Sequence, residues 1–195
     1  MKIIAVIPTL GERTELDPLV AQLSEEAIVA VVINKPKVRN IHKLWNEGVR
    51  LAKNKHADYI AILNDDLKLP ARTLETIVLA METKDFACVG VDPKARFGLP
   101  VKAEIKQITG RVGDLMTEVT TWCFVVKAEA WIDIDERYQW WWGVGDLFEK
   151  IVANGGKLGQ LTGLGILHYG SGTAKNHSWT EAAKKQDAKL WRETH

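Results

Sequence analysis

Two adjacent carboxylates, Asp65 and Asp66, follow the apolar run Tyr59–Leu63 after the single residue Asn64. A short continuous apolar run is typical of a strand buried on both faces, as in a parallel sheet. Open α/β sheets bind their ligands at the carboxyl ends of such strands. Neighbouring carboxylates repel each other unless a cation lies close, and their hard oxygens suit Mg²⁺ or Mn²⁺. The alternative is a solvated turn that caps the next helix, since Asn64 and the two Asp residues are common turn formers.

A second candidate metal ligand is His168, which ends the apolar run 164–167 and precedes a Gly- and Ser-containing loop. Aspartate and histidine together form a plausible mixed ligand set for Mn²⁺. The alternative is a structural histidine, because partly buried histidines are common without any ligand role. Sequence spacing alone does not place His168 beside Asp66.

Asp146 is the candidate general base. It follows Trp-Gly-Val-Gly at the expected start of a helix. Aromatic neighbours would raise the pKa of this carboxyl group by desolvation, which suits a residue that removes a proton. The same position also predicts an N-cap with no catalytic role.

Three of the eight tryptophans are consecutive, at Trp140, Trp141 and Trp142. Successive side chains of an extended segment point in opposite directions, so at least one ring would be exposed. An exposed indole beside a carboxylate can hold the apolar face of a sugar ring. The alternative is that all three rings fill the core, since tryptophan is highly buried on average.

The loop after the first apolar run offers a place for a nucleotide. Pro8, Thr9 and Glu12 lie in this loop, at the predicted carboxyl edge of the sheet. Near the end of the chain, Lys175 could neutralise a leaving diphosphate.

The elements that must position these residues alternate in type. Apolar runs at 3–7, 28–33, 59–63 and 86–91 predict strands, and amphipathic patterns between them predict helices, with Asn40 as one N-cap. This β-α-β alternation predicts an α/β fold with a parallel sheet. The second half differs, because the alternation in 101–106 predicts an antiparallel strand with one wet face, and 119–126 predicts another strand.

We therefore expect a single domain, residues 1–195, with a Rossmann-type mixed sheet. Residues 1–92 would bind the donor, residues 93–175 would carry the acceptor and metal half, and residues 176–195 would form a helical tail, which we expect to be peripheral. The chain is long enough to bury a substantial core.

Composition bounds the function. A formal net charge of +1 and no long basic run argue against a dedicated nucleic-acid binder. Cys88 and Cys123 lie in apolar runs, as reduced core cysteines do, which predicts a cytoplasmic protein. We expect no signal peptide and no membrane span.

With these pieces in order, the chain resembles small family 2-type glycosyltransferases with a GT-A fold. The resemblance covers residues 3 to about 175 and rests on five ordered segments. They are Ile4–Thr9, Asn46-Glu47-Gly48, Leu63–Asp66, Ile134–Tyr138 and His168–Thr173.

The resemblance implies a nucleotide-diphospho-sugar donor, such as a UDP-hexose, and a divalent metal, Mn²⁺ or Mg²⁺. Asp66 and His168 would be the metal ligands. On the donor side it places Pro8, Thr9, Glu12, Asn34, Asn46, Asn64, Asp65 and Lys175. On the acceptor and sugar side it places Asp135, Glu136, Trp141, Trp142 and Gly143. The reaction would be an inverting transfer to a hydroxyl or similar nucleophile, with a carboxylate as base.

Two positions depart from the family pattern. Asn34 stands where the family has an aspartate that reads the base, although an amide still offers uracil one donor and one acceptor. The usual Glu-Asp pair is reduced to Asp146 alone, in a segment that also resembles the Trp-Gly-Gly-Glu-Asp of galactosyltransferase-like enzymes.

Two other functions fit the sequence. A sugar nucleotidyltransferase would need a Gly-rich basic loop after the first strand, of which Leu10–Arg13 is a poor version. A non-catalytic nucleotide- or sugar-binding module would need no base. The acceptor is not specified by the sequence, and the short second half would leave room for a macromolecule.

Overall fold

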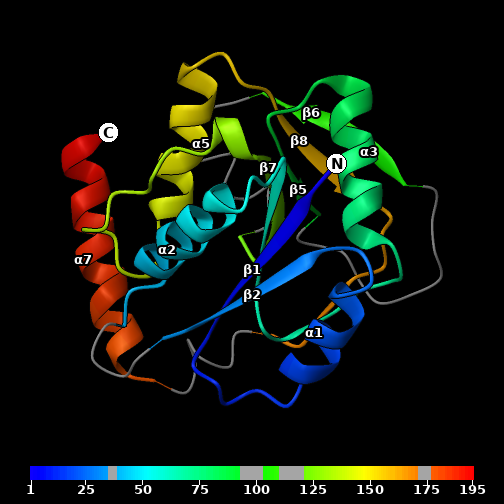
Figure 1. Ribbon diagram of the computed structural model, residues 1–195. Helices are drawn as coiled ribbons and strands as arrows, with labels where there is room; N and C mark the ends of the chain where they lie inside the picture. The colour runs from blue at the N-terminus through cyan, green and yellow to red at the C-terminus, as the bar shows by residue number, and fades with distance from the viewer. Residues whose placement is uncertain (35–38, 93–102, 110–120, 171–176) are drawn as a thin grey trace.

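The computed structural model of the protein describes residues 1–34, 39–92, 103–109, 121–170 and 177–195 (Figure 1). Its strands are β1 (Ile3–Thr9), β2 (Ile28–Ile33), β3 (Tyr59–Leu63), β4 (Leu67–Lys68), β5 (Cys88–Val91), β6 (Glu104–Ile108), β7 (Cys123–Lys127), β8 (Leu158–Thr162) and β9 (Leu167–His168). Its helices are α1 (Leu16–Leu23), α2 (Ile41–Asn54), α3 (Thr73–Lys84), the short 3₁₀ helix η1 (Ala128–Ala130), α5 (Gly143–Ala153) and α7 (Trp179–Thr194).

A seven-stranded sheet in the order β2-β1-β3-β7-β5-β8-β6 forms the centre of the described fold. Strand β1 pairs in parallel with β2 and β3, and β5 pairs in parallel with β8. The antiparallel strand β7 lies between β3 and β5, so these two strands share one direction without touching. The predicted α/β fold with a mixed sheet is confirmed.

The predicted antiparallel strands of the second half are present with shifted bounds. Strand β6 begins at Glu104 and pairs antiparallel with β8, and β7 begins at Cys123. The sequence pattern alone did not indicate that β7 would lie inside the parallel set. A second small sheet joins β4 to β9, with Leu67 opposite His168.

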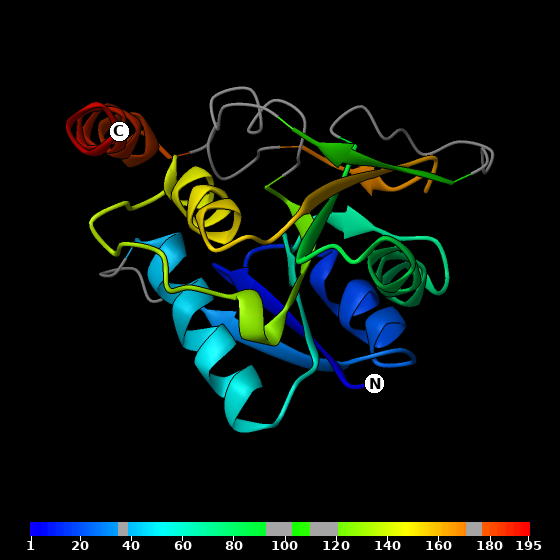
Figure 2. The same cartoon turned by 90° about the horizontal axis from the view of Figure 1, so that it is seen from above.

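Helices cover both faces of the sheet (Figure 2). On one face, α1 and α3 bury a core that includes Leu19, Leu23, Leu74 and Ile77. On the other, α2 and α5 bury Trp45, Val49, Leu147 and Phe148. The N-cap predicted for α2 is confirmed, because Asn40 Oδ1 accepts a hydrogen bond from the backbone N–H of Lys43 at 2.9 Å.

Helix α7 forms the C-terminal tail at the edge of the fold, and three of its residues, Thr180, Ala183 and Asp187, are buried. It lies next to α5 (Figures 1 and 2), where His195 contacts Glu149 at 2.7 Å, and it carries Asp187, whose exposed fraction is 0%. Trp191 of α7 packs against the core on the α2 and α5 face. The polar composition of this segment gave no indication that some of its positions are buried.

None of the described helices combines the length and the apolar character that a membrane span requires.

Close packing of α2 on the sheet gives a stability prediction. A Cβ atom at Gly48 would overlap Cγ1 of Val6 in β1. We expect Gly48→Ala to lower the free energy of unfolding by about 1–3 kcal/mol, although alanine alone favours a helix by about 1 kcal/mol. Urea unfolding measures the change, and Glu47→Ala at the exposed neighbouring position is the control. A Gly48→Ala protein more stable than the wild type would show that the packing is not tight here.

Candidate active site

The carboxyl ends of β1, β2 and β3 meet at one edge of the sheet, because these strands are parallel. Thr9 lies at the end of β1, and its Oγ1 donates a hydrogen bond to Oδ2 of Asp65 at 2.5 Å. The carbonyl oxygen of Thr9 accepts a hydrogen bond from the N–H of Asn34, just beyond β2, at 2.7 Å. Three loops that are far apart in the sequence are therefore tied together at the edge where a ligand is expected.

Asp66 and His168 form the centre of this edge. Oδ1 of Asp66 lies 3.1 Å from Nε2 of His168. The β4–β9 pairing places Leu67 opposite His168, and the carbonyl oxygen of Asp66 accepts a hydrogen bond from the N–H of Tyr169 at 3.0 Å. The small sheet thus places Asp66 beside His168, which the sequence spacing could not predict.

The two atoms of this pair do not hydrogen-bond each other. Nδ2 of Asn64 lies 3.4 Å from Nε2 of His168, which suits an unprotonated acceptor nitrogen. Oδ1 of Asp66 is buried without a hydrogen-bond partner, and the residue has an exposed fraction of only 3%. A lone-pair nitrogen facing an unpaired carboxylate oxygen fits the first two ligands of a divalent cation. The described residues contain no group of three or more His, Cys, Asp or Glu side chains able to hold a metal.

Charge is concentrated around this pair. Burial raises the pKa of Asp65, and the neighbouring charge of Asp66 adds to the rise, while the Thr9 hydroxyl and Arg13 oppose it. A guanidinium nitrogen of Arg13 lies 3.9 Å from Oδ2 of Asp66. Sequence reasoning did not assign Arg13, whose basic character was the available signal. The indole of Trp122 stacks on the His168 ring with centroids 4.9 Å apart.

A cavity of about 450 Å³ opens beside these residues. Its lining combines the loops at the sheet edge with the start of α2 and the tryptophan segment. It comprises Pro8, Thr9, Leu10, Arg13, Asn34, Ile41, His42, Leu44, Trp45, Asn64, Asp65, Asp66, Thr121, Trp122, Trp140, Trp141, Trp142, Val144 and His168.

The polar atoms of the cavity residues are unusual in one respect. Within the described part of the chain, five buried side-chain nitrogen or oxygen atoms have no hydrogen-bond partner: Asn34 Oδ1, Trp45 Nε1, Asp66 Oδ1, Trp141 Nε1 and Trp142 Nε1. All five belong to residues that line this cavity. An unpaired buried polar atom costs about 1–3 kcal/mol, so these atoms indicate a site for a polar ligand.

The structure brings together nine of the residues expected at the site. Pro8, Thr9, Asn34, Asn64, Asp65, Asp66, Trp141, Trp142 and His168 all line the cavity. In the turn, Asp66 is buried and Asn64 and Asp65 are half-buried, so the alternative of a solvated turn does not describe Asp66. Sequence reasoning missed Trp122 because it precedes the antiparallel strand β7, whose beginning lies at the same edge as the end of β3.

Other expected residues lie outside the cavity lining. Asn46 is fully buried and makes two hydrogen bonds with the backbone of Ile134. Its Nδ2 donates to the carbonyl oxygen at 2.9 Å, and its Oδ1 accepts from the N–H at 3.0 Å. Gly143 is a close-packing position, since a Cβ there would lie 2.7 Å from Nε2 of His42. Asn46 and Gly143 therefore have structural contacts that account for them.

The acidic residues before the tryptophan segment make surface ion pairs. Asp135 pairs with Arg137 at 2.5 Å, and Glu136 lies 3.4 Å from Arg50. Glu12 is exposed and lies 3.7 Å from Nε2 of His177. Lys175 lies outside the described residues.

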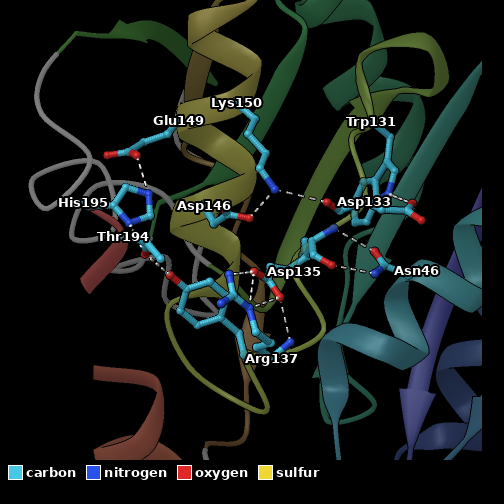
Figure 3. A network of polar contacts seen from close by, with 12 residues as sticks. Asn46, Trp131, Asp133, Asp135, Arg137, Asp146, Glu149, Lys150, Thr194 and His195 are labelled. Carbon is cyan, nitrogen blue, oxygen red and sulfur yellow. Dashed lines mark hydrogen bonds and ion pairs between the residues drawn. The ribbon is translucent and has the colours of Figure 1, made fainter. Parts of the chain in front are cut away.

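Asp146 occupies the first turn of α5, and Trp142, not Asp146, is the N-cap of that helix. Its Oδ2 accepts a hydrogen bond from Nζ of Lys150 at 2.7 Å, and Lys150 also reaches the carbonyl oxygen of Asp133 at 3.4 Å (Figure 3). Asp146 is buried, and it is not among the residues that line the cavity. Its carboxylate is therefore engaged by Lys150.

No protein-family model matches the chain, and no curated protein matches its sequence. Solved structures do match. The chain is similar to A197 from STIV at 13% identity and a TM-score of 0.58, over 88% of this chain and 87% of that one. It is similar to the catalytic domain of Drosophila beta1,4galactosyltransferase 7 at 16% identity and a TM-score of 0.58, over 95% of this chain and 80% of that one. A third match is GalNAc-T7, at 14% identity and 0.56, over 86% of this chain and 44% of that one.

The chain has a GT-A-like α/β fold. At these identities the comparisons establish the architecture and leave the reaction to the residues of the site.

His42 is a cavity residue that sequence reasoning missed. Its Nδ1 lies 3.1 Å from the carbonyl oxygen of Tyr138, which can only accept, so Nδ1 carries the proton. Burial lowers the pKa of His42 to about 4, against smaller opposing effects of the Tyr138 carbonyl, Asp187 and Asp146. The ring is therefore neutral near pH 7, with an unprotonated Nε2.

This lowered pKa predicts acid sensitivity. Between pH 4 and 6.5 the unfolded chain binds a proton at His42 that the folded chain does not, so stability falls as the pH falls through this window. The full shift corresponds to about 3 kcal/mol. We expect His42→Gln to show a shallower dependence of the unfolding free energy on pH than the wild type. Equal slopes in the two proteins would contradict the buried neutral ring, and His56→Gln at an exposed histidine is the control.

Proposed function

We propose that the protein is a metal-dependent glycosyltransferase that moves a hexose from a UDP-sugar to a hydroxyl group of an acceptor. The observation that carries the proposal is the Asp66–His168 pair, with Oδ1 of Asp66 lacking a hydrogen-bond partner, in the lining of a cavity that is also lined by tryptophans. A pair of side chains that can bind a divalent cation, in a cavity with aromatic lining, suits a ligand with a diphosphate at one end and a sugar at the other.

The related folds support this choice of ligand. The GalNAc-T7 structure contains UDP, GalNAc and Mn²⁺. A mutant of the Drosophila galactosyltransferase was solved with manganese, UDP-Gal and xylobiose. For this chain, a divalent metal held by Asp66 and His168 would neutralise the charge that develops on the leaving diphosphate.

The chain's own residues would divide the donor between them. Asn34 has a buried, unpaired Oδ1 and would bind the uracil base with its amide group. Asp65, fixed by the Thr9 hydroxyl, would lie near the ribose. Arg13, 3.9 Å from Asp66, would add positive charge near the diphosphate. The indoles of Trp141 and Trp142 would contact the sugar.

The donor site is tested by thermal unfolding with UDP-, GDP- and dTDP-sugars, each with and without Mn²⁺. A ligand at a hundred times its Kd stabilises the native state by about 2.7 kcal/mol, which is about 5–11 °C for a chain of this size. We expect one UDP-hexose to raise the Tm only with Mn²⁺, and Asp66→Asn and His168→Ala to lose the shift.

The matched control is Asp17→Asn, which removes a carboxylate from an exposed position of α1. It should keep the full Tm shift. If no nucleotide sugar shifts the Tm of the wild type with Mn²⁺, the transferase proposal is wrong.

For the base we retain Asp146, in an inverting mechanism. To accept a proton from the acceptor hydroxyl, its carboxylate would have to exchange the 2.7 Å contact with Lys150 for the incoming hydroxyl group. The Lys150 contact also favours a second candidate function, a non-catalytic sugar-nucleotide-binding module, because it occupies the only acid of that segment.

Asp146→Asn separates the two functions. If Asp146 is the base, release of UDP in the presence of simple sugar acceptors should fall by about 10²–10⁴-fold, while the Tm shift by the donor is retained. Lys150→Met, which frees the carboxylate, is the companion variant and should keep turnover. Unchanged UDP release by Asp146→Asn would exclude Asp146 as the base, and no release by the wild type would favour the binding module.

A further inference from the structure

A buried carboxylate of α7 holds the backbone of the tryptophan segment. Asp187 accepts hydrogen bonds from three consecutive amides: Gln139 at 3.0 and 3.1 Å, Trp140 at 2.8 Å and Trp141 at 2.8 Å. Its exposed fraction is 0%. Among the described residues, its carboxylate is held by backbone N–H groups, as an anion is held in a nest.

The carbonyl groups of the same segment are held from the opposite side by α2. The N–H of Ile41 donates to the carbonyl oxygen of Gln139 at 2.8 Å, and Nδ1 of His42 donates to that of Tyr138 at 3.1 Å. Helix α7 thus fixes the donors of the segment while α2 fixes its acceptors.

Side chains of α7 also contact each indole of the segment. The ring of Trp142 stacks on Trp191 with centroids 5.7 Å apart, and Trp140 meets Trp179 edge to face at 5.0 Å. Nζ of Lys184 lies 5.6 Å from the centroid of Trp141. These ring contacts, and the hydrogen bonds that the backbone amides donate to Asp187, all involve residues of helix α7.

The backbone of Trp142 shows that the segment is held under constraint. Its φ is +65°, in the left-handed region that a residue with a Cβ atom rarely adopts. Such conformations persist where surrounding contacts impose them, and they are frequent at ligand sites. The three indoles held in this way all line the cavity.

We propose that Asp187 is a positioning residue: by holding the amides of Gln139, Trp140 and Trp141, it sets the indole wall of the cavity and thereby the affinity for the sugar part of the donor. The nucleotide and cation end is built from β1, β2, β3 and β9, so Asp187 does not act on nucleotide affinity. This assignment rests on the proposed function for the identity of the ligand.

The test compares UDP with the UDP-hexose that stabilises the wild type, by titration calorimetry with Mn²⁺. We expect Asp187→Ala to keep the Kd of UDP within about twofold and to lose at least tenfold of the extra affinity that the hexose supplies. Asp187→Asn retains the side-chain volume and one acceptor oxygen, so its loss should be smaller. Glu181→Gln, at an exposed position of the same helix, removes the same charge and should behave as the wild type.

A second readout needs no ligand. Hydrogen exchange measured by NMR should be at least a hundredfold faster at the amides of Gln139, Trp140 and Trp141 in Asp187→Asn, with the amides of β1 and β3 unchanged. Equal weakening of UDP and UDP-hexose, a wild type that binds the two equally, or unchanged exchange at the three amides would each overturn the assignment. If the wild type binds neither ligand, the proposed function fails, and the exchange rates alone decide whether Asp187 holds the segment.

Discussion

The antiparallel pairing of β4 with β9 is the contact on which the candidate site depends. Without it, Asp66 would end an ordinary buried strand, and His168 would belong to a separate loop. The pairing of Leu67 with His168 and the bond from Tyr169 to Asp66 hold the two side chains 3.1 Å apart while leaving the carboxylate oxygen unpaired. A divalent cation would stabilise this buried carboxylate beside the half-buried imidazole, as the proposed function requires.

Unpaired buried polar atoms at the site lower the stability of the folded protein. The unpaired buried atoms of the described residues belong to cavity residues, whereas elsewhere buried polar groups such as Asn46 and Thr180 are paired with backbone. His42, buried and neutral, adds an acid-sensitive group to the same wall. A fold selected for stability alone would satisfy these atoms, so their clustering distinguishes a binding site from a packing defect.

Two helices on the same face of the sheet connect the site to the rest of the fold. Helix α2 and helix α7 bind the backbone of the tryptophan segment from opposite sides. Helix α2 donates hydrogen bonds to its carbonyl oxygens, and Asp187 of α7 accepts hydrogen bonds from its N–H groups. Different parts of the chain thus build the cavity: strand ends carry the residues proposed to bind the cation and the nucleotide, and helix–loop contacts hold the tryptophan segment.

The sequence by itself determined the alternating strands and helices, the α/β fold and the sheet edge that carries Thr9, Asn34 and Asp66, because apolar periodicity and strand direction act locally. Tertiary structure decided what local patterns do not encode. It inserted β7 between β3 and β5, which brought Trp122 to the site, and it paired Asp146 with Lys150. It also buried Asp187, in a helix that its composition marks as polar. Each of these depends on contacts between residues far apart in the chain, and such contacts leave no periodic trace in the sequence.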